Sequence, residues 1–159
     1  MSQQLSTSAQ KIQEKLQTLG FSSQVVELPA STRTAKEAAQ AIGTSIEQIV
    51  KSLIFKARHS GKAILVVASG SNRVNEKRLS ELVGEPIDKA DADFVRQSTG
   101  FAVGGVPPLG HAQSLETYID EDLLCYDDIW AAAGTPHAVF CLTPTDLQKM
   151  TDGRVVTIV

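Results

Sequence analysis

The hydrophobic residues near the N-terminus repeat with the period of a helix. Ile12, Leu16 and Leu19 are separated by four and then three positions, and Gly20 follows them. Apolar residues at this spacing line one face of a helix, and a glycine commonly ends it. The pattern predicts a helix over residues 8–19.

Further helices are predicted from capping residues. Thr34 and Glu37 in the stretch TAKE form a capping box, and Gly43 supplies the C-terminal stop. A second such box, Ser45 to Gln48, favours another helical start immediately afterwards. The same kind of signal occurs at three later positions, where the expected caps are Asn75, Asp91 and Thr143.

Strands are indicated where the period changes to two or where β-branched residues cluster. From Leu53 the stretch LIFKARHSGKAILVVAS predicts a hairpin with its turn near Ser60 and Gly61. The second arm, residues 63–68, is apolar on both faces and should be a central strand. Short strands are also expected at SQVVELP, which Pro29 ends, and at the C-terminal RVVTIV.

Strands therefore neighbour one another in both halves, with helices dispersed between them. This order differs from the regular βαβ alternation of a doubly wound sheet. With 159 residues, 42% hydrophobic and 21% charged, the chain has the size and composition of one globular domain. We expect a single α/β domain of the α+β type over residues 1–159, with 1–7 as a flexible tail.

The net charge of −3 and a pI near 5.6 argue against a protein that holds duplex DNA with its whole surface. The opening MSQQLSTSAQ has no apolar signal segment, and no apolar run reaches membrane-spanning length, which favours a cytoplasmic protein without membrane contact. A local basic patch remains open, with a solvated face as the alternative; its members would be Lys51, Lys56, Arg58, His59, Lys62, Arg73, Lys77 and Arg78.

Side-chain chemistry is sparse. Cys125 and Cys141 form no CxxC pair, and the three histidines lack metal-ligand spacing, so neither a redox pair nor a metal site is predicted. The serines have no nucleophile-elbow context. The acidic residues around one short apolar stretch should be caps and a solvated face, although one of them could orient a ligand amine; these are Asp120, Glu121, Asp122, Asp127 and Asp128.

Two features leave alternatives open. The stretch TGFAVGGVPPLGH, residues 99–111, is either a structural turn between strands or a loop whose backbone N–H groups hold a carbonyl oxygen or oxyanion. His137 follows the Gly134 and Pro136 turn and precedes an apolar strand, so it is either a hydrogen-bonded turn residue or a polar group at a pocket mouth.

Lys51 lies where two periods compete. If the helix begun at Ser45 continued, Lys51 would face water; if a strand had already begun, Lys51 would share a face with Ile49, Leu53 and Phe55. Periodicity alone favours the surface position.

Four ordered motifs reverse that preference. The stretches IVKSLIF, SGSNRVNEKRLSELVG, TGFAVGGVPPLGH and AAGTPHAVFCLTPTDL, within residues 20–152, resemble the YbaK and prolyl-tRNA synthetase insertion-domain family of aminoacyl-tRNA deacylases. The resemblance implies a mixed, mostly antiparallel, barrel-like sheet flanked by helices. It also implies hydrolysis of the ester that joins a wrongly attached amino acid to the 3′ end of tRNA, without a cofactor.

The resemblance assigns site residues by position. Lys51 corresponds to the strand-entry lysine, and the GxxxP loop places Gly104, Gly105 and Val106 at the reacting centre, followed by Pro107 and Pro108 at the substrate. The late glycine turn contributes Gly134, with His137 as a candidate specificity residue. Thr34, at its helix start, is a second candidate partner for a substrate hydroxyl or thiol.

The leading hypothesis is a trans-editing deacylase for a small amino acid of the alanine, serine, cysteine and threonine class. Its partners would be the 3′ end of an aminoacyl-tRNA and, as a further candidate, a synthetase. We expect Lys51 at the junction of helix and strand, with its ammonium in a cleft bounded by the Gly104 loop. The alternatives are an inactive tRNA- or synthetase-binding adaptor, and a small-molecule hydrolase or ligand-binding domain that acts without tRNA.

Overall fold

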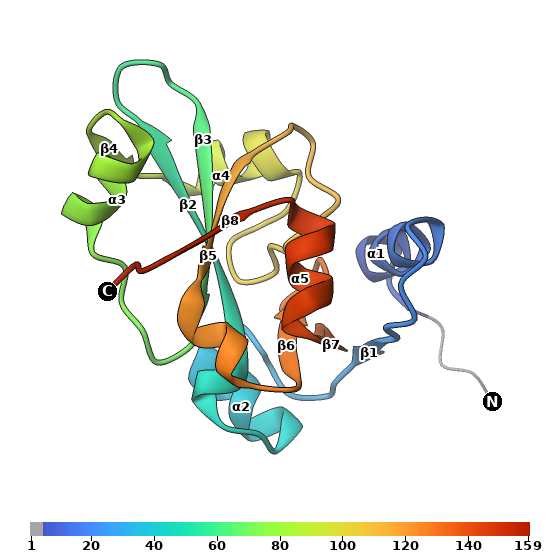
Figure 1. Ribbon diagram of the computed structural model, residues 1–159. Helices are drawn as coiled ribbons and strands as arrows, with labels where there is room; N and C mark the ends of the chain where they lie inside the picture. The colour runs from blue at the N-terminus through green and yellow to red at the C-terminus, as the bar shows by residue number, and fades with distance from the viewer. Residues whose placement is uncertain (1–4) are drawn as a thin grey trace.

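The computed structural model describes residues 5–159 and contains five α-helices, two 3₁₀ turns and eight strands (Figure 1). The helices are α1 (Thr7–Thr18), α2 (Ala35–Ile42), α3 (Glu76–Val83), α4 (Ala92–Thr99) and α5 (Pro144–Thr151), and the 3₁₀ turns are η1 (Ile46–Gln48) and η2 (Glu121–Cys125). The strands are β1 (Val25–Glu27), β2 (Ile49–Ala57), β3 (Ala63–Ser69), β4 (Ile87–Lys89), β5 (Glu116–Asp120), β6 (Ile129–Ala132), β7 (Ala138–Leu142) and β8 (Arg154–Val156).

The predicted helix caps are confirmed. Thr34, Asn75, Asp91 and Thr143 each accept a hydrogen bond from a backbone N–H in the first turn of the helix that follows. These bonds satisfy donors that would otherwise have no partner inside the helix. Among the described residues, no helix is both long and apolar enough to cross a bilayer.

A helical turn begins after Ser45 as predicted, but the capping box predicted there does not form. The Ser45 hydroxyl donates to the Gln48 side chain instead of capping the backbone, so the segment makes only the single turn η1. Strand β2 then begins at Ile49, four residues before the expected Leu53. Pairing of Ile49 and Val50 with β6, which local sequence does not reveal, extends the strand towards the N-terminus.

At the N-terminus, Ser6 caps α1 and Leu5 packs against the main core. Of the tail expected over residues 1–7, residues 1–4 lie outside the described part of the chain. Leu19 was expected on the buried stripe, but it is the C-cap of α1 and is 46% exposed. The buried Gln13 fixes α1 to the sheet, because its side chain accepts from the Val25 N–H and donates to the Ser23 carbonyl.

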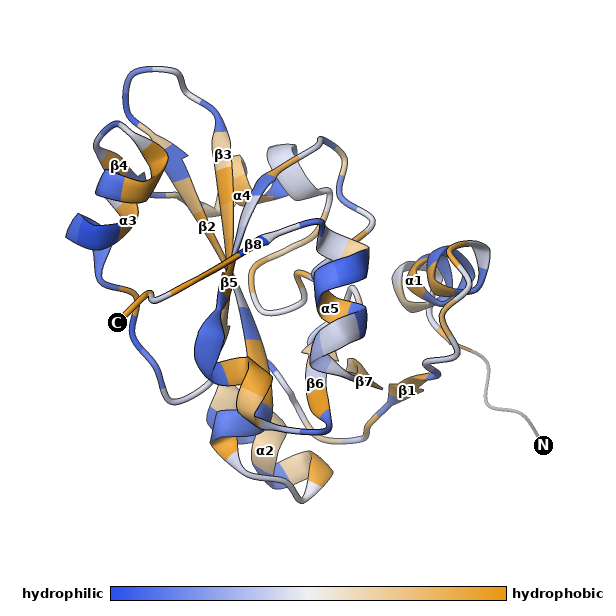
Figure 2. Cartoon of the chain, viewed as in Figure 1, coloured by the Kyte–Doolittle hydropathy of each residue, from blue (hydrophilic) through white to orange (hydrophobic). Residues whose placement is uncertain are grey.

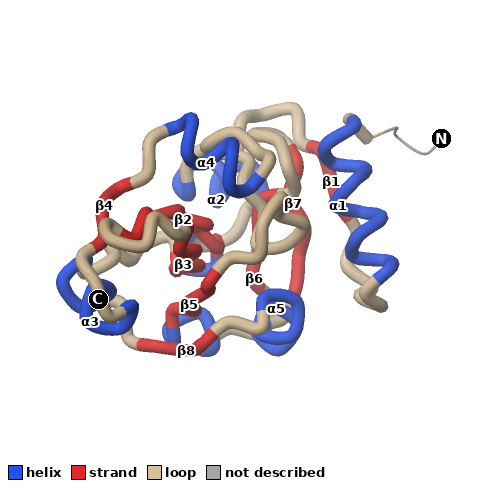
Figure 3. The backbone as a smooth tube through the Cα atoms, turned by 90° about the horizontal axis from the view of Figure 1, so that it is seen from above, coloured by secondary structure: helices blue, strands red, loops and turns tan. Residues whose placement is uncertain are grey.

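The strands form one mixed sheet in the order β1-β7-β6-β2-β3-β5-β8, with β4 attached to β2. Four strand pairs are antiparallel and three, β2 with β6, β3 with β5 and β5 with β8, are parallel. Seen from above, the sheet curls around α5 (Figure 3). The expected fold class, a mixed and mostly antiparallel barrel-like sheet flanked by helices, is confirmed.

Strand β3 is buried at every position, as its apolar sequence predicted. Its two faces belong to different cores: Leu65 and Val67 pack with α1, α4 and α5, whereas Ile64 and Val66 pack beneath α3. Figure 2 shows β3 as an apolar strand at the centre of the molecule, with hydrophilic positions on the outside of α3.

Strand β2 has a full-length neighbour on one edge only. β3 pairs with β2 from Val50 to Lys56, whereas the other edge is shared between β6, at Ile49 and Val50, and β4, from Phe55 to Ala57. No strand among residues 5–159 pairs with the other side of residues 51–54, which we call the open edge of β2. The candidate site forms at this interruption of the sheet.

Candidate functional site

A cavity of about 270 Å³ lies between α2, the first half of β2, β6 and the loop that carries Gly104. The walls from α2 and β6 are made largely of small side chains, namely Ala35, Ala38, Ala131 and Ala132. Ile42, Trp130 and Val139 supply the larger apolar surfaces. The polar groups that reach the cavity include Thr34 and Lys51, so a mostly apolar space has a few polar side chains at defined places, as ligand sites commonly do.

Lys51 is the third residue of β2 and lies inside the strand, not at a helix-to-strand junction. Its side chain is half-buried and lines the cavity together with Val103, Gly104 and Val106, so the surface position favoured by periodicity is wrong. The Nζ atom donates to the Asn72 carbonyl oxygen at 2.5 Å. Burial lowers the pKa of Lys51; nearby Asp120 partly opposes this shift and Arg73 adds to it.

The carboxylate near Lys51 is held by three donors. Asp120 is 1% exposed and accepts from the Ser69 N–H at 2.9 Å, the Asn72 side-chain amide at 2.8 Å and the Asp122 N–H at 3.0 Å. Asn72 thus connects the two charges, since its carbonyl receives Lys51 and its amide reaches Asp120. Asp120 caps η2 as expected, but the solvated position expected for it is wrong.

The Gly104 loop, residues 101–111, closes the cavity from the side opposite β2. Gly104 has φ +92°, a conformation that favours glycine. The N–H of Gly134 donates to the Gly105 carbonyl at 2.9 Å, and a Cβ on Gly105 would lie 2.9 Å from the Thr135 Cα atom. The loop is therefore pressed against the turn before β7.

The far end of the loop is held by a half-buried histidine. His111 Nε2 lies 2.6 Å from the Pro107 carbonyl oxygen, and burial lowers the pKa of this imidazole. Because a carbonyl oxygen only accepts, Nε2 carries the proton of this hydrogen bond. Within residues 5–159, the N–H groups of Gly104 and Val106 have no backbone acceptor, so they remain able to donate to a ligand.

The structure brings only part of the predicted site to the cavity. Thr34, Lys51, Gly104 and Val106 line it. Four others do not line it: Gly105, Pro107, Pro108 and Gly134. Of these, Gly105 is bonded to Gly134 and Pro107 to His111, contacts that hold the loop. His137 is exposed, does not line the cavity, and its Nδ1 lies 3.2 Å from the Ala30 carbonyl oxygen, an arrangement that matches the turn-residue alternative.

Several contributors had no recognisable signal in the sequence. Trp130 and Ala131 reach the cavity because β6 pairs in parallel with the start of β2, and parallel partners far apart along the chain are not visible in local periodicity. Asn72 and Asp120 meet because β3 and β5 are also parallel neighbours. Arg33 directly precedes Thr34, and its stem contacts the face of Gly104.

Thr34 is already engaged within the protein. Its hydroxyl accepts from the Glu37 N–H at 3.1 Å and lies 3.2 Å from the Glu37 carboxylate. Replacing Thr34 with alanine should therefore lower the free energy of unfolding by about 0.5–2 kcal/mol through loss of the cap, whereas Thr34→Ser should keep nearly all of it. Urea denaturation of both variants measures this, and an unchanged Thr34→Ala midpoint would contradict the capping role.

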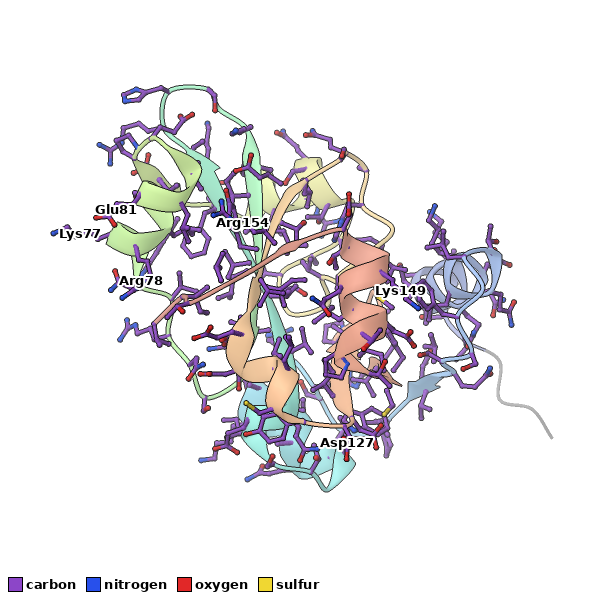
Figure 4. The ribbon with its side chains drawn as sticks, in the orientation of Figure 1. Lys77, Arg78, Glu81, Asp127, Lys149 and Arg154 are labelled. Atoms are coloured by element: carbon purple, nitrogen blue, oxygen red, sulfur yellow. The ribbon has the colours of Figure 1, made fainter. Side chains whose placement is uncertain are left out.

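The basic residues for which a local patch was left open are divided among different contacts. Arg58 pairs with Asp88 at 2.8 Å and Lys62 with Glu116 at 3.1 Å, while the Lys56 ammonium lies 5.2 Å from the centre of the Phe94 ring. Lys77 and Arg78 project from α3 into solvent (Figure 4). Among the described residues, no group of three or more His, Cys, Asp or Glu side chains is arranged to hold a metal ion.

Comparison with known proteins gives consistent matches. A family model described as "Aminoacyl-tRNA editing domain" matches residues 29–150. Uncharacterized protein YwhH of Bacillus subtilis is 31% identical over 131 residues, which are 82% of this chain and 83% of that protein. The Enterococcus faecalis protein named "Putative Cys-tRNA(Pro)/Cys-tRNA(Cys) deacylase EbsC" is 24% identical over 126 residues, 79% of this chain and 76% of that one.

A solved structure described as "a putative trans-editing enzyme for prolyl tRNA synthetase" superimposes with a TM-score of 0.92 and 51% sequence identity. The alignment covers 98% of each chain. The family expected from the four motifs is the family that these comparisons match.

Proposed function

This chain belongs to the aminoacyl-tRNA editing domain family, and from that premise we propose that it hydrolyses the ester between a small mischarged amino acid and tRNA. The substrate class is that of alanine, serine, cysteine and threonine. The partner is the 3′ end of an aminoacyl-tRNA, with a synthetase as a second partner that delivers it. This substrate implies a cytoplasmic location.

The cavity beside Lys51 is the observation that carries the proposal. Its volume of about 270 Å³ lies below the range common for sites of drug-sized ligands, and alanine side chains form two of its walls. A pocket of this kind admits a small side chain and excludes larger ones by size. It discriminates poorly between isosteres, so serine, cysteine and alanine fit one class.

The reaction needs little from protein side chains. An aminoacyl ester is already activated, so water can add to the carbonyl carbon once it is positioned and the developing oxyanion is stabilised. The N–H groups of Gly104 and Val106 are suited to the oxyanion, and Lys51 is suited to orienting the acceptor end as a compact cation. The ester C–O bond then breaks, and the ribose oxygen takes the proton from water.

A deacylation screen tests the proposal. We expect purified protein to hydrolyse tRNAs charged with alanine, serine, cysteine or threonine about tenfold faster or more than the same tRNAs charged with leucine or phenylalanine. Release of labelled amino acid gives the rate, with the uncatalysed rate subtracted. A complete panel of mischarged tRNAs left intact, with synthetases present, contradicts the proposal.

Two other functions of the same fold give different results in that screen. An inactive adaptor would bind tRNA or a synthetase while single-turnover hydrolysis stays at the uncatalysed rate. A small-molecule hydrolase would act on aminoacyl esters without nucleic acid and would be insensitive to salt. The retained Lys51 and Gly104 loop at one cavity favour the deacylase over both.

A further inference from the structure

We propose that the open edge of β2 recognises the adenine of the terminal nucleotide, which binds in a second cavity next to the first. The proposal deepens the deacylase function and rests on it for the identity of the ligand. It is argued from the backbone of β2, the lining of the second cavity and the charges at its mouth.

The second cavity has a volume of about 320 Å³ and lies between β2, β4 and the Gly104 loop. It shares Ser52, Leu53, Val103, Gly104 and Val106 with the first cavity, so the two adjoin along the open edge of β2. One ligand can therefore occupy both, with the amino acid in one, the base in the other and the ribose at Gly104.

The surfaces around this cavity are suited to a planar base. Leu53, Phe55, Val74 and Val95 contribute apolar lining. Val103, at the lip between the cavities, is 58% exposed, which is unusual for so apolar a side chain. A base that covered Val103 would remove this apolar surface from water.

The backbone of β2 supplies the polar groups. Ala57 N–H donates to Lys62 across the hairpin and Arg58 N–H donates to Pro86 on the β4 side. Since backbone groups alternate along a strand, even-numbered residues face the β4 side, and the groups of Ser52 and Ile54 face the open edge. Within residues 5–159, no strand pairs with Ser52 or Ile54 on this edge.

This arrangement matches adenine. The Ser52 carbonyl and the Ile54 N–H are an acceptor and a donor two residues apart on the same edge, and adenine presents an N6–H donor beside the N1 acceptor. Hypoxanthine and guanine present an acceptor and an N–H donor at these atoms, which reverses both bonds. The Ser52 hydroxyl is also buried without a hydrogen-bond partner among the described residues, which leaves it available to a ligand between the two cavities.

Positive side chains complete the site. Arg73 and Lys89 line the second cavity and are exposed, and neither forms an ion pair within residues 5–159. The phosphates on the 5′ side of the terminal adenosine would leave the cavity past these two side chains. The carboxylate of Glu76 also lines the cavity and repels phosphate. The attraction for phosphate is therefore assigned to Arg73 and Lys89 alone.

The first test uses free nucleotides and does not depend on hydrolysis. In an amide NMR titration, adenosine 5′-monophosphate should shift the Ser52 and Ile54 signals and bind about tenfold more tightly or better than inosine 5′-monophosphate. The 7-deaza analogue, which keeps N1 and N6, should bind like the adenine nucleotide. Equal affinity for the two nucleotides overturns the proposal. So does the absence of binding when either nucleotide is added to roughly 10 mM, since a weaker affinity would not support a recognition site.

Charge variants add a matched control. Lys89→Met and Arg73→Met should each weaken binding of adenosine 5′-monophosphate without weakening binding of adenosine. Lys149→Met removes the same charge from α5, on the other side of the molecule from α3 (Figure 4), and should change neither. Equal weakening by all three variants would show a general charge effect and contradict the assignment of the two cations.

The second test separates this site from the proposed function. A minihelix carrying the same amino acid on terminal adenosine or terminal inosine should be deacylated with kcat/KM about tenfold lower for inosine. Equal rates overturn adenine recognition and leave the deacylase standing. Selective binding of adenosine 5′-monophosphate by a protein that hydrolyses no aminoacyl-tRNA supports the adenine site, overturns the deacylase, and assigns the cavity to free adenine nucleotides.

Discussion

Replacing Lys51 with alanine is expected to lower kcat/KM for deacylation by about 10²- to 10³-fold, the usual loss when one preorganised electrostatic group is removed. The cation lies on the wall of the first cavity and is held by the Asn72 carbonyl. Lys51 and Arg33 are the two charged side chains that line this cavity, so without Lys51 the acceptor end keeps one cation there instead of two. Deacylation under single-turnover conditions measures the loss.

The pH dependence gives an independent readout. Because burial lowers the pKa of Lys51 below the 10.5 of a free lysine, a rate that needs the ammonium should fall with rising pH earlier than it would with an exposed lysine. Lys51→Arg should move this fall to higher pH. The stability effect has the opposite sense: the folded chain loses this proton more readily than the unfolded chain, so this contribution to stability improves as pH rises through the folded pKa.

Lys51→Met separates charge from packing. It keeps an unbranched apolar stem of nearly the same length, so the fold should persist while the rate falls as in Lys51→Ala. A Lys51→Met protein with wild-type kcat/KM would show that the stem, not the charge, matters, and the proposed role would have to be given up.

Gly105→Ala is expected to lower the free energy of unfolding by about 1–3 kcal/mol, as overpacking of a close contact usually does. The added Cβ would lie 2.9 Å from the Thr135 Cα atom and 3.0 Å from its N and C atoms. These are backbone atoms and cannot move aside as a flexible side chain can. The Gly104 loop must therefore shift away from the turn before β7, and kcat/KM should fall together with stability.

Gly61→Ala is the matched control. Gly61 has φ +76°, so alanine is strained there, but no atom lies within 4 Å of the added Cβ and the residue is at the tip of the β2–β3 hairpin. This variant should lose about 1 kcal/mol of stability and keep its activity. If Gly105→Ala keeps both wild-type stability and wild-type activity, the close contact does not position the loop.

The features that depend on residues close together in the chain, namely the helix caps and the burial of β3, could be predicted from the sequence. The caps at Thr34, Asn75, Asp91 and Thr143 satisfy helix donors within a few residues, so their positions could be derived from the sequence and are confirmed. The burial of β3 followed in the same way from its unbroken apolar run. The four ordered motifs predicted the family, and with it the curled mixed sheet.

The site itself depends on pairings that no local pattern contains. Lys51 belongs to the strand because Ile49 and Val50 pair with β6, which lies about eighty residues further along the chain. Only the folded sheet reveals a pairing between segments so far apart. Asp120 is buried because β5 pairs with β3 and brings it to Asn72. For His137 the local turn was predicted from the sequence, but the direction of its side chain was not, because its contact with Ala30 joins distant parts of the chain.

Unpaired strand edges usually invite pairing with another chain, which leads to aggregation. The open edge of β2 is limited to residues 51–54, with β6 closing one end and β4 the other, and the Gly104 loop stands beside it. An incoming strand of ordinary length does not fit between these borders. The same interruption of the sheet that admits a small ligand thus protects the folded chain from edge-to-edge association.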